Sequence, residues 1–129
     1  MKNLEDTLKE TGLPYKKNGD WGLGLMPMQG SNRAHAYNIH FTGEEEGGFR
    51  YHQIRCAIGP VGDGSNLRKI CEILSQQNRG SIGVSNGDIW LKWTVPTGIS
   101  AKTLTWQLYG AAQTADEIEK EVFKGADKE

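Results

Sequence analysis

The sequence has no long apolar run and only two cysteines, Cys56 and Cys71. No stretch approaches the ~20 apolar residues that a membrane-spanning helix requires, and the charged residues throughout positions 1–10 do not fit a secretory signal peptide. Two isolated cysteines are more typical of small core residues in a reducing compartment than of a disulfide scaffold. We therefore expect a cytoplasmic protein that makes no contact with a membrane.

The sequence also has no large excess of positive or negative residues. Fifteen Lys and Arg residues against sixteen Asp and Glu residues leave a net charge of −1, which gives no overall attraction to nucleic acid. Basic and aromatic residues do occur together, as in proteins that bind single strands, but they fall on separate expected strands and faces. These residues are Lys16, Lys17, Arg33, Arg50 and Arg55 with Tyr15, Trp21 and Tyr51. We expect no nucleic-acid partner.

The sequence has no close pair of metal ligands such as Cys-x-x-Cys. His35, His40 and His52 lie on expected neighbouring strands, where hydrogen-bonded histidines are the usual finding. His52 and Cys56 lie about 13 Å apart on one strand at ~3.3 Å per residue, too far for a base and its nucleophile. Residues 59–64 are rich in glycine but lack the Lys-Ser/Thr ending of a phosphate-binding loop. We expect no metal, no cofactor and no enzymatic activity.

The clearest pattern that is present is an amphipathic helix over residues 100–123. Ser100 is the expected N-cap, and Gly125 is expected to end the helix. Apolar residues recur at steps of three and four, which predicts a single buried stripe. The stripe consists of Leu104, Leu108, Ala111, Ala115, Ile118 and Val122. The acidic residues near the end of the helix, Asp116 among them, are expected to form a solvated face.

Trp106, Tyr109 and Gln113 fall on the side of this helix opposite the stripe. Either the first helix or a loop covers them, or they form a dimer or peptide-binding surface, since Trp and Tyr are typical interface anchors. Trp90 is expected to point from the last strand away from the core, onto a sheet face that can stay uncovered. We take Trp90, Trp106, Tyr109 and Gln113 as the candidate partner-binding residues.

The other patterns predict a single domain over residues 1–129. A short helix capped by Asn3 precedes three strands at 21–28, 33–41 and 49–58. Residues 15–18 lead into a turn at Gly19-Asp20, and residues 43–48 are expected to form a solvated hairpin loop. A second helix starts at Ser65 or Asn66, and Cys71 belongs to its inner face. A hairpin with an Asn86-Gly87 turn follows. The fold class is α+β: one five-stranded antiparallel sheet with helices packed on it, in the order α-β-β-β-α-β-β-α.

Several short segments match a known pattern in the same order along the chain. They are TGLPY at 11–15, GPVG at 59–62, residues 74–78, GIS at 98–100 and ADEI at 115–118. With this order of elements, the chain resembles the YbjN-like family, whose fold is similar to that of type III secretion chaperones. The resemblance implies a twisted antiparallel sheet with helices on it, often dimeric, that handles protein partners rather than reacting with a substrate.

These observations favour a non-catalytic protein- or peptide-binding module, chaperone-like or regulatory. One alternative is an architectural homodimer in which the same aromatic residues are buried between two protomers. Another is a small-molecule sensor that uses the strand around Gly22 and Gly24 as a pocket wall, because these glycines leave one strand face without side chains.

Overall fold

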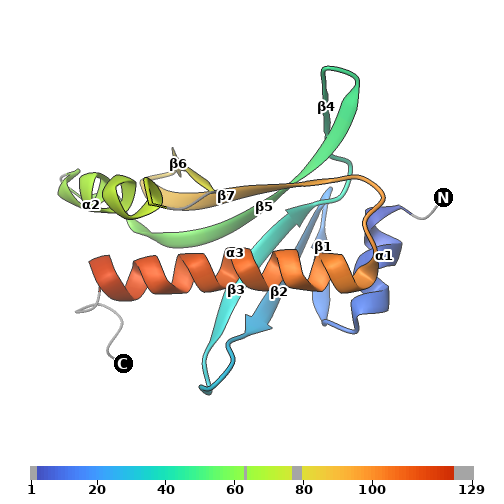
Figure 1. The fold of residues 1–129 in the computed structure, drawn as a ribbon, viewed down its shortest axis with the longest axis horizontal. Coiled ribbons are helices and arrows are strands. Elements are labelled where there is room, and N and C mark those ends of the chain that lie inside the picture. Colours follow the sequence, from blue (N-terminus) through green and yellow to red (C-terminus); the bar gives the residue numbers. More distant parts are fainter. Residues whose placement is uncertain (1–2, 63, 77–79, 124–129) are drawn as a thin grey trace.

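The computed structural model describes residues 3–62, 64–76 and 80–123. Within these ranges it has three helices and a single antiparallel sheet of seven strands, which confirms the predicted α+β class (Figure 1). The elements are α1 (Leu4–Thr11), β1 (Tyr15–Asn18), β2 (Trp21–Pro27), β3 (Ala34–His40), β4 (Glu44–Glu46), β5 (Phe49–Pro60), α2 (Ser65–Leu74), β6 (Ser81–Ser85), β7 (Asp88–Pro96) and α3 (Ala101–Val122). None of the described helices is long and apolar enough to span a membrane.

The strand order is β1-β2-β3-β5-β7-β6, and β4 pairs with β5 away from this path. The predicted count of five strands is therefore wrong, because the β1 segment was expected only to lead into a turn and the β4 segment was expected to be a loop. Both are short and polar, so neither shows the alternation of apolar and polar residues that marks a half-buried strand. Pairing with a neighbouring strand, β2 for β1 and β5 for β4, makes them extended despite their composition.

The sheet divides between β3 and β5. These strands pair at only two positions, Asn38 with Arg55 and Ile39 with Ile54, whereas β5 pairs with β7 along most of its length. Figure 1 shows the consequence: β2 and β3 run steeply across the view while β5 and β7 lie almost along α3. The helix α3 crosses this division and packs on strands from both halves.

The stripe predicted for α3 is confirmed. Leu104, Leu108, Ala111, Ala115 and Ile118 are fully buried, and Val122 is half-buried at the end of the helix. The Ser100 hydroxyl accepts a hydrogen bond from the amide of Thr103 at 3.1 Å, so this residue is the N-cap. Gly125 lies outside the described residues. The buried face is wider than the predicted stripe, since Ala112, Thr114 and Asp116 are buried as well.

The two shorter helices pack against α3. Asn3 caps α1 by accepting from the amide of Asp6 at 2.8 Å, and Gly12 ends α1 with a left-handed backbone, both as expected. In α2 the cap is Gly64, whose φ is 92°, rather than a side chain of Ser65 or Asn66. Cys71 is exposed instead of facing inward, because α2 buries fully only Ile70 among its described residues.

Gly22 and Gly24 do not form a pocket wall. They face the core, and rings from the neighbouring strand segment lie over them. A Cβ atom on Gly22 would come within 2.5 Å of the Phe41 ring, and one on Gly24 within 2.6 Å of the Tyr37 hydroxyl. The missing side chains therefore make room for two aromatic rings of the same chain.

Truncation of the stripe tests this packing. Leu108→Ala should lower the free energy of unfolding by about 2–5 kcal/mol, because it opens a cavity at a fully buried site. The matched control on the same helix is Trp106→Ala, which should change it by no more than about 0.5 kcal/mol because the side chain is 71% exposed. Urea denaturation monitored by circular dichroism measures both, and comparable losses in the two variants would contradict the packing described.

Candidate functional site

One face of the sheet carries the helices, and the other face, here called the outer face, is open. No outward-pointing residue of β2, β3, β5 or β7 is buried. The exposed apolar side chains of this face include Leu25, which is 60% exposed, together with Leu23 and Tyr51. A sheet face that combines apolar and charged side chains in this way is a candidate binding surface.

The hairpin of β4 and the start of β5 projects from the rest of the sheet (Figure 1). The outer face has a hollow beside this hairpin. This hollow, here called the outer groove, has a volume of about 750 Å³. Trp21, Tyr51 and Arg55 line it together with the three glutamates of β4, and Thr94 contributes from β7. Its volume is within the range of pockets that hold a small ligand or a few side chains of a partner.

A bulge between β3 and β4 gives the groove its shape. Ile39 pairs with Ile54 and Glu44 with Tyr51, so residues 40–43 lie opposite only residues 52 and 53. The two extra residues turn the β4–β5 hairpin away from the rest of the sheet. Gly43 occupies the bulge with φ of 73°, and a Cβ atom there would lie 2.6 Å from the carbonyl oxygen of Tyr51.

Two histidines fix the bulge through the backbone. The Nδ1 of His40 accepts a hydrogen bond from the amide of Gly43 at 3.2 Å, and the Nδ1 of His52 donates to the carbonyl of His40 at 3.0 Å. His52 is buried, and burial lowers its pKa below the usual value. Both rings therefore have a structural role at the base of the groove.

The floor of the groove is held in place by contacts among its own side chains. The Arg55 guanidinium lies 5.0 Å from the centre of the Trp21 ring, and its Nε donates to the side chain of Gln53. The centre of the His40 ring lies 4.7 Å from the centre of the Trp21 ring. On the wall, Glu45 pairs with Arg50 at 3.5 Å. The three carboxylates of β4 exceed the single arginine of the lining, so the groove is acidic.

The four residues predicted to bind a partner do not form one surface. Trp90 is half-buried on the outer face opposite Ala57 and Gly83, about 13 Å along β7 from Thr94 at ~3.3 Å per residue. Trp106 and Gln113 are exposed on α3, on the other side of the sheet. Sequence periodicity assigns a residue to a side of its own element, but it does not show which elements share a face.

Tyr109 fits the predicted alternative in which another part of the same chain covers it. Its ring packs on the hydrophobic core, and its hydroxyl accepts a hydrogen bond from the amide of Gln29 at 3.1 Å. The loop between β2 and β3 thus covers Tyr109, so its aromatic ring needs no partner protein to explain it. Trp106, one turn away, stays 71% exposed.

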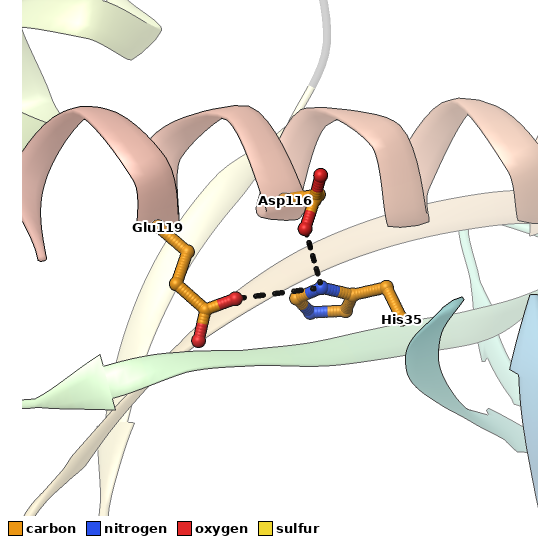
Figure 2. A group of neighbouring side chains, drawn as sticks. All are labelled: His35, Asp116 and Glu119. Carbon is orange, nitrogen blue, oxygen red and sulfur yellow. Dashed lines mark ion pairs between the residues drawn. The ribbon is translucent and has the colours of Figure 1, made fainter. Parts of the chain in front are cut away.

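On the opposite face, His35, Asp116 and Glu119 come together between β3 and α3 (Figure 2). We call these three residues the His35 cluster. Within the described ranges it is the group of His, Cys, Asp and Glu side chains close enough to share a metal ion, and its ligand atoms all lie within 4.8 Å of one another. Of the three histidines noted in the sequence, His35, His40 and His52, the cluster contains His35.

Asp116 is 4% exposed, so the predicted solvated face is wrong at this residue. Its Oδ1 accepts a hydrogen bond from Nη2 of Arg33 at 2.6 Å, and its Oδ2 lies 3.5 Å from the ammonium of Lys120. Burial by itself would raise the pKa of Asp116, but the hydrogen bond from Arg33 and the two positive charges outweigh it and hold the pKa below its usual value. The carboxylate is therefore ionised inside the fold.

Comparison with protein-family models, with curated proteins and with solved structures finds no match for this chain. The resemblance to the YbjN-like family therefore stays a prediction. The candidate sites are defined by the geometry of this chain.

The bulge can be tested with two glycines of the same hairpin. Gly47→Ala should cost about 1–2 kcal/mol of unfolding free energy, because its φ is 59° but its surroundings are open. Gly43→Ala should cost more, since the strain is similar and the new methyl group also collides with the Tyr51 carbonyl. Thermal unfolding compares the two, and equal losses would show that residue 43 is not confined as described.

Proposed function

We propose that this protein is a non-catalytic binding module that takes up a cationic, partly apolar segment of a partner protein in the outer groove. The observation that supports this most directly is the combination of an acidic wall, formed by Glu44–Glu46, with the aromatic side chains of Trp21 and Tyr51. Carboxylates favour lysine and arginine, and the rings provide apolar surface for the carbon chains of the same side chains.

Contacts already present in the groove favour a cation over an anion. Arg55 is the groove residue that would attract an acidic ligand, and its guanidinium already packs on Trp21 and donates to Gln53. The wall carboxylates are exposed and line the groove. Binding an anion would require displacing Arg55 from its contacts. A cation would compete with Arg50 at Glu45, but Glu44 and Glu46 can take it up without breaking that pair.

The outer face can also accommodate a longer segment. Leu23 and Leu25 extend the apolar surface along β2. Trp90 lies about 13 Å from the groove residue Thr94, which an extended chain of four residues spans at ~3.3 Å per residue. A partner segment anchored in the groove thus reaches Trp90 in our proposal, and Trp90 keeps its predicted role as an anchor.

The charge preference can be measured with two fluorescent peptides of equal length, one alternating lysine with leucine and the other glutamate with leucine. The lysine peptide should bind the wild type more tightly, and binding should weaken as salt is added. Fluorescence anisotropy gives both affinities.

The informative variant combines Glu44→Lys with Glu46→Lys, which should reverse the preference between the peptides. Its control combines Glu72→Lys on α2 with Glu121→Lys on α3, two exposed carboxylates far from the groove. The control has the same net charge and should keep the wild-type preference. If the groove variant and the control behave alike, the groove is not the binding site.

A symmetric homodimer is a second candidate, favoured by the 71% exposure of Trp106 on α3. An indole so exposed is a typical anchor between protomers. Light scattering should then give the wild type twice the mass of one chain and Trp106→Ala the mass of one chain, with unchanged circular dichroism. A monomeric wild type, or a variant that stays dimeric, would rule out this interface.

A further inference from the structure

The His35 cluster lies where the two halves of the sheet part, and His35 bridges the division. Its Nε2 is 2.9 Å from the carbonyl oxygen of Ala57, in the part of β5 that no longer pairs with β3. A carbonyl oxygen only accepts hydrogen bonds, so Nε2 carries the proton. In the neutral ring, the lone pair is therefore on Nδ1.

That lone pair faces two carboxylates. Nδ1 is 3.7 Å from Oδ1 of Asp116 and 3.7 Å from Oε1 of Glu119, and Figure 2 shows both side chains reaching the ring from consecutive turns of α3. The side chains of His35 and Asp116 are 8% and 6% exposed, and that of Glu119 is 30% exposed. Three groups rich in electrons converge at distances beyond the usual ~2.7–3.2 Å of a hydrogen bond.

We propose that Nδ1 of His35 and the carboxylates of Asp116 and Glu119 bind one divalent transition-metal ion. One imidazole nitrogen and two carboxylate oxygens suit Zn²⁺ or Mn²⁺, whose bonds to such ligands are roughly 2.0–2.2 Å long. Two ligands at that distance with a tetrahedral angle between them are about 3.4 Å apart. The separations of 3.7 Å from Nδ1, and of no more than 4.8 Å between any two of the ligand atoms, have to close onto the ion, which rotation of the carboxylates would allow.

The surroundings of the cluster support this assignment. The hydrogen bond from Nε2 to the Ala57 carbonyl fixes both the tautomer and the direction of the ring, as the outer contacts of metal-bound histidines usually do. The partial exposure of Glu119 leaves a path for the ion and for a water ligand. His35 and the α3 carboxylates lie on different elements, so an ion would also join α3 to β3.

Arg33 competes with the ion for Asp116. Its Nη2 and the Nδ1 of His35 face the same oxygen, Oδ1, at 2.6 and 3.7 Å. Lys120 adds a second positive charge near Oδ2. Because these cations balance the carboxylates and repel a metal, binding involves an exchange in which the ion takes the place of Arg33 on Oδ1.

The test is titration of the protein with Zn²⁺ and with Mn²⁺ by calorimetry, in a Cys71→Ser background that removes the exposed thiol as a competing ligand. We expect one ion per chain. Arg33→Gln should tighten binding by roughly tenfold, the effect of one like charge removed near the ion. Glu119→Gln should weaken it by about 10- to 100-fold.

Glu117→Gln is the matched control, because Glu117 is exposed on another side of α3. It should leave the affinity unchanged, and circular dichroism checks that every variant is folded. With Co²⁺ in place of Zn²⁺, the visible absorption should change between wild type and Glu119→Gln. Absence of stoichiometric binding in both the wild type and Arg33→Gln would overturn the proposal, as would binding that Glu119→Gln leaves intact.

Discussion

The packing of α3 across the divided sheet is the constraint on which the rest of the structure depends. Because β3 and β5 pair at only two positions, the space between them has to be filled by side chains from another element. The stripe of α3 supplies them, and the small residues Ala111, Ala112 and Ala115 let the helix lie close to the strands. The other helices pack against α3, and the outer face is left uncovered.

The strand β5 connects the two candidate sites. Its beginning pairs with β4, two of its middle residues pair with β3, and the part near Ala57 lies beyond that pairing. Where the partner changes from β4 to β3, the bulge opens the outer groove on one face. Where the pairing with β3 ends, His35 reaches across to Ala57 on the other face. Both sites thus follow from the way one long strand changes neighbours.

Local signals in the sequence predicted the local features of the fold. The caps at Asn3 and Ser100 and the Asn86-Gly87 turn depend on a few adjacent residues, and each is present. The strands β1 and β4 were missed because edge strands exposed on both sides need no apolar alternation. Charged residues were assumed to be solvated, and the buried Asp116 shows where that assumption fails.

Sequence patterns could not predict either candidate site. Trp90 and Trp106 were grouped by residue type, but the sheet lies between them. His35 and Asp116 are far apart in the sequence, and only the packing of α3 on β3 brings them together. The same holds for Trp21 and the glutamates of β4, which line one groove because of a bulge that no residue pattern signals.

The indole N–H signals of the four tryptophans test most directly whether the outer face is the binding face. A lysine-leucine peptide is added to isotope-labelled protein, and the four signals are followed by NMR. The account predicts that the signals of Trp21 and Trp90 shift while that of Trp106 stays in place. A shift of Trp106 with Trp21 unaffected would contradict it.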